Sequence, residues 1–248
     1  MTERSKIAIT GGNGLVGTAL SSQLSDRYDI TRIDRPDVDI INDTEKFHNT
    51  LAGAKTIIHL AGVFGLKKDG KENWRSPHRD PINTELFNAA IRGAAEQGVK
   101  QFIHASSIHV EDTMEFSATN SGLLEPAPAR FVTKTKSGYG VGKREQESLL
   151  SENTQLFEHG AVSIRLGGVT PDNLPMQQHA DAEVLAHEHA VWVEHADLAD
   201  LVARIIEQKN DASHEVVYAV SNNDNRFHDT RNRYGWTPSA NSDEHISR

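Results

Sequence analysis

The 248-residue sequence contains no cysteine, which excludes disulfides, thiolate metal sites and cysteine-based catalysis. It also lacks an excess of positive charge. Its 26 Lys and Arg residues against 35 Asp and Glu give a formal net charge of -9, which argues against nucleic-acid binding. No apolar run approaches membrane-spanning length. The polar residues 1–5 lead into the first apolar run without a signal segment, so we expect a cytoplasmic protein without membrane contact.

What the sequence does contain is a regular alternation of short apolar segments and helical patterns. We predict a short strand before Asp39, and strands over residues 6–10, 29–34, 56–61, 100–105, 161–166 and 216–220. Helices are expected to begin near Gly14, Asn83, Tyr139 and Ala196. This alternation predicts an α/β fold with a doubly wound parallel sheet.

The length of the chain suits one Rossmann-like domain with a small addition. We predict a dinucleotide-binding domain over residues 1–167. A small C-terminal substrate-binding region over residues 168–248 is expected to be interleaved with the last strand and helix of the sheet. The tail after Trp236 is polar, and we expect it to be loosely held.

Three glycines follow the first predicted strand, in the run TGGNGLVG at residues 10–17. Gly11 permits a tight turn, Gly14 lets a pyrophosphate approach the backbone, and Gly17 lets the next helix pack close to the strand. The first N–H groups of that helix and its positive dipole end would face the phosphates. Glycine turns are common, so this pattern gains weight only from the features that follow.

Asp34 ends the second predicted strand, about 20 residues past the glycines, where a carboxylate accepts hydrogen bonds from the adenosine ribose. A carboxylate there repels a 2′-phosphate and favours NAD. The adjacent Arg35 is able to hold such a phosphate, so NADP stays open. Asp39 and Ile40 are placed to flank the adenine ring. The alternative is that both aspartates are ordinary turn formers.

The sequence YGVGK places Tyr139 and Lys143 at i and i+4, on one face of a helix. The pKa of a phenol is about 10, too high for a base near neutrality, but an adjacent ammonium group favours the phenolate. Tyr139 would then accept a proton from a substrate hydroxyl. Ser107, at the end of the fifth strand, would bond the same oxygen. A surface helix pair and an ordinary polar strand end are the alternatives.

These motifs in this order resemble the extended branch of the short-chain dehydrogenase/reductase superfamily, the NAD-dependent epimerase/dehydratase-like group. They are TGGNGLVG, Asp34, HLAG at residues 59–62, ASS at residues 105–107, and YGVGK. The resemblance implies a Rossmann-like sheet, a catalytic set of Ser107, Tyr139 and Lys143, and a homodimer. It also implies a structural Asn at the start of the fourth helix, which matches Asn83.

The residues expected to contact the cofactor come from these motifs and from the next strand end. They are Gly11, Asn13, Gly14, Leu15, Val16, Gly17, Asp34, Arg35, Asp39, Ile40, Leu60, Ala61, Gly62, Asn83, Ala105, Tyr139, Lys143 and Leu166.

A narrower resemblance is to uronate dehydrogenases, through residues 105–109, 162–171, 216–224 and 234–236. That group oxidises the anomeric carbon of a sugar acid with NAD. The resemblance implies a substrate set of Phe64, Ser107, Ile108, His109, Gly168 and Gln177. Three of these differ from the group's pattern: Ile108 replaces an Asn, Phe64 a Ser and Gln177 an Arg. Lost polar contacts should weaken a sugar substrate strongly, so the substrate is expected to differ or the activity to be lost.

Cationic and imidazole side chains also gather outside these motifs. Lys67, Lys68, Lys71, Arg75, His78 and Arg79 follow the HLAG motif and would hold an anionic group of a substrate, or form a solvated loop. His179, His187, His189 and His195 lie close in sequence but lack a zinc-binding spacing, so we predict no metal site.

The sequence therefore predicts an NAD-dependent oxidoreductase acting on a hydroxyl of a sugar, sugar acid or related polyhydroxy compound. One alternative is a nucleotide-sugar epimerase or dehydratase, which usually has a larger region than the roughly 80 residues that follow residue 166. The other is a non-catalytic redox sensor that binds the dinucleotide; relatives of that kind typically lose the Tyr or the Lys.

Overall fold

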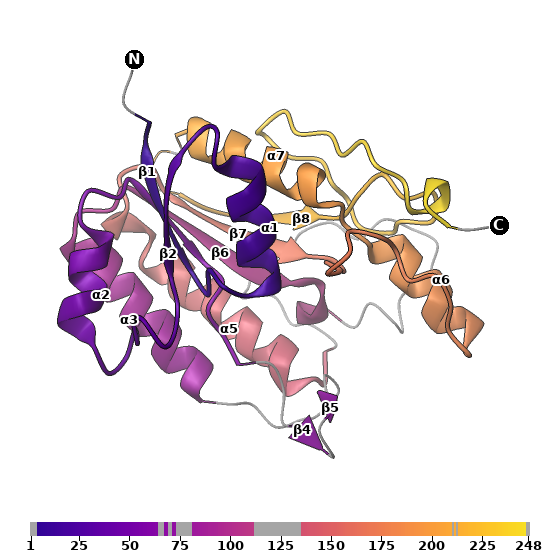
Figure 1. Cartoon of the computed structure of the whole chain (residues 1–248), viewed down its shortest axis with the longest axis horizontal. Coiled ribbons are helices and arrows are strands. Elements are labelled where there is room, and N and C mark those ends of the chain that lie inside the picture. The colour runs from indigo at the N-terminus through magenta and orange to yellow at the C-terminus, as the bar shows by residue number, and fades with distance from the viewer. Residues whose placement is uncertain are drawn as a thin grey trace.

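Six parallel strands form one sheet, in the order β2-β1-β3-β6-β7-β8 (Figure 1). The computed structural model describes residues 4–63, 81–111, 135–209, 211 and 213–246, and the backbone of 67–68 and 71–72. The strands are β1 (Lys6–Thr10), β2 (Asp29–Ile33), β3 (Thr56–His59), β6 (Gln101–Ser107), β7 (Ala161–Leu166) and β8 (His214–Ala219). An antiparallel pair, β4 (Lys67–Lys68) and β5 (Lys71–Glu72), lies outside this sheet.

Helices cover both faces of the sheet, as the predicted doubly wound fold requires. One face carries α1 (Leu15–Leu24) and α7 (His195–Glu207). The other carries α2 (Thr44–Leu51), α3 (Ile82–Glu96) and α5 (Gly138–Glu152). Outside these layers lie α6 (Ala182–Val191) and the 3-10 turns η1 (Ile108–Val110), η2 (Thr154–Leu156) and η3 (Ser242–Glu244).

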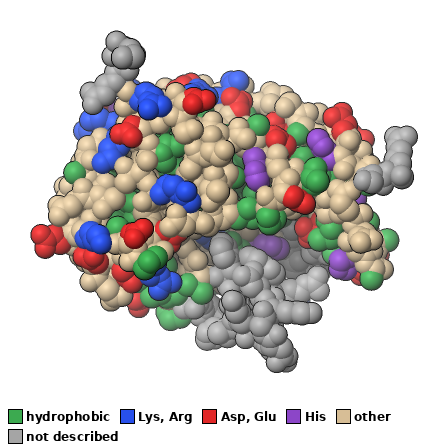
Figure 2. Space-filling model, in the orientation of Figure 1, with side chains coloured by type: hydrophobic (Ala, Val, Ile, Leu, Met, Phe, Trp, Pro, Cys, Tyr) green, Lys and Arg blue, Asp and Glu red, His purple; other side chains and the backbone are tan. Residues whose placement is uncertain are grey.

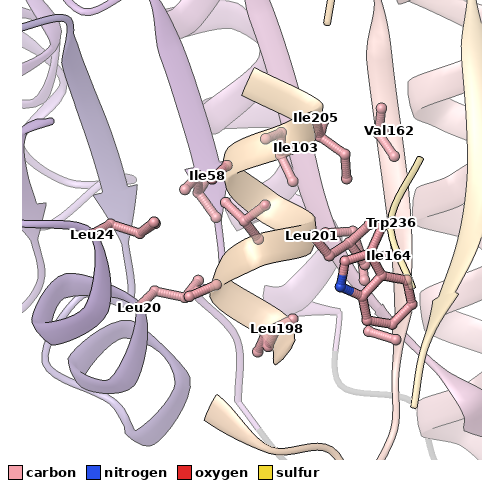
Figure 3. Packing of buried hydrophobic residues seen from close by; sticks show 14 of the residues in the cluster. Leu20, Leu24, Ile58, Ile103, Val162, Ile164, Leu198, Leu201, Ile205 and Trp236 are labelled. Atoms are coloured by element: carbon pink, nitrogen blue, oxygen red, sulfur yellow. The ribbon is translucent and has the colours of Figure 1, made fainter. Parts of the chain in front are cut away.

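Alternating side chains along the strands supply a separate core to each face. In β1, Ile7 and Ile9 pack toward α1 and α7, whereas Ala8 packs toward α2 and α3. The apolar stripe of α7 provides Leu198, Leu201 and Ile205 to the first core, which also holds the Trp236 indole (Figure 3). Burial on both faces explains why the strands read as continuous apolar runs.

The chain reverses its direction of travel across the sheet between β1 and β3. It passes from β1 through α1 to the edge strand β2, then returns through α2 to β3 on the other side of β1. Loops at the carboxyl ends of β1 and β3 therefore diverge and leave a crevice, which is where open α/β sheets bind ligands.

The structure confirms the six main strands and the four helix starts within a few residues, but one expected strand is absent from residues 34–40 and two helices were missed. The expected strand before Asp39 is a turn, in which the Val38 N–H donates to the Asp34 carbonyl oxygen at 2.9 Å. Pro36 lies inside this turn and has no N–H to give to a strand ladder. Helices α2 and α6 were not predicted.

The expectation of a loose tail after Trp236 was also wrong for the described residues 237–246. The Asp197 carboxylate accepts hydrogen bonds from the backbone N–H groups of Ser239 and Ala240 and from the hydroxyls of Ser221 and Ser239. The Trp236 indole N–H donates to the Asp197 carbonyl oxygen at 2.9 Å. A polar tail is therefore fastened to the start of α7 by one carboxylate.

The described surface mixes charges of both signs. Figure 2 shows acidic and basic side chains interspersed over one face, with histidines mostly toward the C-terminal half. Among the residues that the structure describes, no helix is both long enough and apolar enough to cross a membrane.

The Asp197 junction gives a test of how the tail contributes to stability. Asp197→Ala leaves several donors without their acceptor, and we expect the free energy of unfolding to fall by about 3 kcal/mol. Urea denaturation would measure this. Asp200→Ala, on the same helix, removes only a half-exposed pair with Arg204 and should cost about 0.5 kcal/mol. Equal losses in the two variants would contradict the junction's importance.

Candidate active site

The crevice between β1 and β3 holds a cavity that is open to solvent, with about 800 Å³ of empty space. Loops after β1, β2 and β3 and the start of α3 form its walls. Its lining residues include Gly11, Gly14, Asp34, Arg35, Asp39, Ile40, Leu60, Ala61 and Gly62, all of which the sequence analysis predicted.

The glycine turn has the backbone geometry that the sequence predicted. Gly11 has a φ of +67°, and a Cβ there would lie 2.8 Å from the Ala61 nitrogen. A Cβ on Gly17 would lie 2.6 Å from the Gly11 oxygen, so glycine keeps α1 close to the turn. Gly14 is the N-cap of α1 and makes no side-chain cap. The N-terminus of α1, which begins with Leu15 and Val16, is thus left to meet an anion.

Asp34 stands at the wall of this cavity, held by the backbone around it. Its two carboxylate oxygens accept N–H groups from Asn13 and Arg35, each at 2.9 Å. The Asp39 carboxylate instead accepts the N–H groups of Ile41 and Asn42, and the hydrogen bonds from Asn42 lower its pKa most. Asp39 therefore shapes the turn that carries Ile40, while Asp34 joins the two loops at the cavity.

Asn83 fixes the loop that follows β3. Its side-chain amide donates to the Val63 carbonyl oxygen at 2.8 Å and accepts the Val63 N–H at 2.6 Å. Its own carbonyl oxygen accepts the Gln146 side-chain amide from α5 at 3.0 Å. Asn83 is thus a structural link between the cofactor crevice and α5.

The i and i+4 spacing of Tyr139 and Lys143 brings both side chains to the end of β6. The Lys143 ammonium lies 5.9 Å from the centroid of the Tyr139 ring and donates to the Ala105 carbonyl oxygen at 2.6 Å. Ser107 ends the same strand, two residues after Ala105, and its hydroxyl oxygen accepts the His109 N–H at 3.1 Å. Three groups that the sequence analysis assigned to catalysis therefore come from α5 and β6, which pack directly together.

Gly140 makes this approach possible, which sequence analysis missed. A Cβ on Gly140 would lie 1.9 Å from the His109 carbonyl oxygen, so only glycine lets α5 reach η1 at this distance. The Tyr139 and His109 rings meet edge to face, with centroids 6.0 Å apart. The glycine beside the tyrosine in YGVGK was the available signal.

Burial sets the charge state of the groups beneath the site. Desolvation lowers the pKa of Lys143 to about 8, against the opposing effect of the Glu147 carboxylate. Burial also lowers the pKa of His59 to about 3 and that of His104 well below its ordinary value, with Lys143 as a further cause. These two imidazoles are therefore neutral, and Lys143 is the cation of this cluster near neutral pH.

Comparison with known proteins gives this geometry a family. Residues 7–187 match the NAD dependent epimerase/dehydratase family. The chain belongs to this family. The match covers most of the chain and includes the glycine turn, Asp34, Ser107, Tyr139 and Lys143.

Relatives within the epimerase/dehydratase family include dehydrogenases of sugars and sugar acids. The chain is 26% identical over 246 residues to a uronate dehydrogenase of Pseudomonas syringae pv. tomato, covering 91% of this chain and 80% of that protein. It is 24% identical over 263 residues to an L-arabinose 1-dehydrogenase (NAD(P)(+)) of Haloferax volcanii, covering 96% and 97%.

Solved structures show the same fold. A glucuronic acid dehydrogenase from Chromohalobacter salexigens matches with a TM-score of 0.72 at 20% identity, over 97% of this chain and 86% of that one. A uronate dehydrogenase variant from Agrobacterium tumefaciens, complexed with NAD, matches with a TM-score of 0.70 at 18% identity, over 97% and 87%.

The predicted substrate residues are placed very differently from one another. Ile108 is 4% exposed and packs in an apolar cluster with Tyr218 and Phe227. The Gln177 side-chain amide donates to the carbonyl oxygens of Pro175 and His245. Outside the residues whose side chains are described lie Phe64 and the predicted anion contacts Lys67, Lys68, Lys71, Arg75, His78 and Arg79.

Leu166 and Gly168 lie beside the end of β6, where the register of the sheet places them. Leu166 is paired with Ser107 across β7 and β6, and Gly168 follows two residues later. Sequence analysis missed Glu188 of α6, whose carboxylate oxygen is 3.8 Å from the position of a Cβ on Gly168. Burial raises the pKa of Glu188, while His179 and His189 oppose the shift.

The clustered C-terminal histidines bond to separate backbone groups. His189 contacts the Met176 carbonyl oxygen at 2.6 Å, and His195 contacts that of Thr170 at 2.9 Å. Among the described residues, no three His, Asp or Glu side chains are placed to share a metal ion.

The lowered pKa of Lys143 predicts that its contribution to the free energy of unfolding depends on pH. Its folded pKa of about 8 lies below the value of 10.5 expected when unfolded, so the unfolded chain binds more protons between these values. The wild type should therefore gain stability relative to Lys143→Met as pH rises through this window. We expect the difference between the two free energies of unfolding to change by about 2 kcal/mol from pH 7 to pH 10.

Urea denaturation of both proteins at several pH values measures this difference. Lys100→Met, which removes a surface lysine paired with Glu158, serves as the control and should show no such trend. A difference that stays constant with pH would mean that Lys143 is not shielded from water as described.

Proposed function

We propose that this protein is an NAD-dependent oxidoreductase that oxidises a hydroxyl group of a sugar, sugar acid or related polyhydroxy compound. The observation that carries the proposal is the junction of α5 and β6. There the Tyr139 ring lies 5.9 Å from the buried Lys143 ammonium, on a helix packed against β6, the strand that ends at Ser107. The family is NAD-dependent, and sugar dehydrogenases among the relatives support the class of reaction.

The cavity fits NAD on its own chemistry. Gly14 at the N-terminus of α1 would hold the pyrophosphate, and Asp34 would accept the adenosine ribose hydroxyls. Ile40 and the neighbouring apolar side chains would flank the adenine. NAD, when bound, supplies the hydride acceptor for the reaction.

The residues of this chain would handle the proton and the substrate oxygen. The Ser107 hydroxyl would donate to the substrate hydroxyl oxygen, while the Tyr139 phenolate would take the proton from it. The Lys143 ammonium would stabilise that phenolate through its positive charge. Its bond to the Ala105 carbonyl oxygen fixes the distance at which it acts. The neutral His59 and His104 are excluded as bases that cycle near neutral pH.

Removing the phenol tests the role of Tyr139. Tyr139→Phe should lower kcat by about 1000-fold, because the variant lacks the phenolate that would accept the proton. Its affinity for NAD should stay within about twofold, since the cavity walls are untouched. Absorbance of reduced cofactor measures turnover, and calorimetry measures binding. Turnover of Tyr139→Phe close to that of the wild type would refute the mechanism. A wild type that retains NAD tightly and shows no net redox would instead indicate an epimerase.

We expect the edge of the proposed site near Gly168 to favour a neutral sugar over a sugar acid. Glu188 places a shielded carboxylate against Gly168, and Gln177 carries no charge to pair with a substrate carboxylate. A second carboxylate near Glu188 would be repelled at low local dielectric. We therefore expect kcat/KM for aldoses to exceed that for the matching uronates by at least about tenfold.

A panel of aldoses and uronates, each tried with NAD and with NADP, measures this preference. Glu188→Gln should reduce the preference for aldoses by raising kcat/KM for uronates. Glu183→Gln changes an exposed position on the same helix and should leave the preference unchanged. A wild-type preference for uronates that Glu188→Gln does not alter would overturn the assignment.

A further inference from the structure

A line of alternating charges runs beneath the proposed catalytic residues, from Lys143 through Glu147 and Arg165 to Glu111. Arg165 is 1% exposed and lies on β7, and Glu147 is fully buried on α5. Two guanidinium nitrogens of Arg165 donate to the two carboxylate oxygens of Glu147, both at 2.9 Å. A third donates to Glu111 at 2.8 Å. Hydrogen bonds thus join the last three of these charges.

Further hydrogen bonds fix both carboxylates. The Ser106 hydroxyl donates to Glu147 at 2.5 Å, and the Tyr218 hydroxyl donates to Glu111 at 2.6 Å. The Arg165 guanidinium also lies 5.7 Å from the centre of the Tyr218 ring. Glu147 therefore has partners on both β6 and β7, which hold α5 against the two strands.

These contacts join the segments that carry the proposed catalytic groups. Glu147 follows Lys143 by one turn of α5 and Tyr139 by two. Ser106 directly precedes Ser107, and Glu111 directly follows η1, which contains His109. A movement of Arg165 would therefore displace every one of these segments.

Stability alone does not account for so many buried charges. Removing two ions from water is costly, and apolar side chains of similar volume often serve a core equally well or better. Here the buried ions lie one turn from the lysine that the proposed reaction requires as a cation. Their placement points to a role in the site.

We propose that Glu147 and Arg165 are positioning residues, which hold α5 on β6 and β7 and together set how readily Lys143 keeps its positive charge. This inference rests on the proposed function for its catalytic meaning. Glu147 supplies the negative charge that acts on Lys143. Arg165 holds Glu147 in place through two hydrogen bonds, and its own positive charge opposes the effect of Glu147 on Lys143. Neither residue contacts the cavity, so both act through Lys143.

Charged and titratable groups near Lys143 lie on its own helix and on neighbouring elements, including His109 of η1, whose ring meets that of Tyr139. Tyr139 and Glu147 lie on its own helix, His104 lies on β6 and His59 on β3. Arg165 reaches Glu147 from β7. Burial is the largest cause of the lowered pKa of Lys143, and the Glu147 carboxylate opposes it. Arg165 is paired with Glu147, so the balance between these two charges bears on how readily Lys143 keeps its proton.

Two substitutions with opposite effects test this balance. Glu147→Gln removes the anion and should lower the titration midpoint of Lys143 by at least about one pH unit. Arg165→Gln removes the opposing cation and should raise the midpoint. NMR titration of lysines labelled with ¹³C at Cε measures both, with the Lys143 signal assigned by its loss in Lys143→Met. Glu152→Gln, an exposed position on α5, should leave the midpoint unchanged.

Turnover gives the second readout. In Glu147→Gln the decline of kcat at alkaline pH should begin at a lower pH, with KM for NAD within about twofold of the wild type. Glu147→Asp, which keeps the charge, should restore much of the profile. If the role of Glu147 were purely structural, both Glu147 variants would lose thermal stability. The Lys143 midpoint would then not move in opposite directions in Glu147→Gln and Arg165→Gln.

The outcomes separate this inference from the proposed function. Unchanged Lys143 midpoints in Glu147→Gln and Arg165→Gln would overturn the inference, even if the wild type oxidises sugars. If the wild type oxidises no sugar but the Lys143 midpoint still shifts in the two variants, the charge balance is supported and the proposed reaction is rejected. If Glu147→Gln does not fold, Arg165→Gln and Glu147→Asp still decide, because they predict a raised and a retained midpoint respectively.

Discussion

The packing of α5 against the end of β6 is the contact on which the candidate site depends. Gly140 permits it, since any Cβ there would meet the His109 carbonyl oxygen. Lys143 then reaches the Ala105 carbonyl oxygen, and Gln146 reaches Asn83 at the start of α3. Asn83 in turn holds the loop after β3 that lines the cavity. One helix therefore sets the position of both the proposed catalytic groups and a wall of the proposed cofactor site.

Much of the fold could be predicted because its signals are local. Apolar runs such as residues 6–10 mark strands that are buried on both faces, and the stripe on α7 has the helical period. Helix α6 escaped prediction because its apolar residues follow no clear stripe, and its Asp181 cap lies in an irregular stretch. The turn at residues 34–38 was mistaken for a strand because Val38 and Ile40 are buried without belonging to the sheet.

The site divides in the same way. Gly11, Gly17 and the pair Tyr139 and Lys143 were predictable, because turn geometry and helical spacing depend on near neighbours in sequence. The Arg165 network, by contrast, joins α5, β7 and the end of η1. Glu188 meets Gly168 only because the chain near the end of α6 returns to the segment that follows β7. No local pattern encodes such contacts, since each depends on how distant segments pack.

The buried imidazoles have a consequence for the protein in acid. Burial lowers the pKa of His59 and His228 to about 3 and that of His214 to about 4, and it also lowers that of His104 well below its ordinary value. In the unfolded chain these rings would take up protons near pH 6.5. The folded state resists that uptake, so its advantage declines as pH falls from 6.5 toward 4. The buried histidines of the described residues therefore make the folded state less stable as the pH falls from neutral into mild acid.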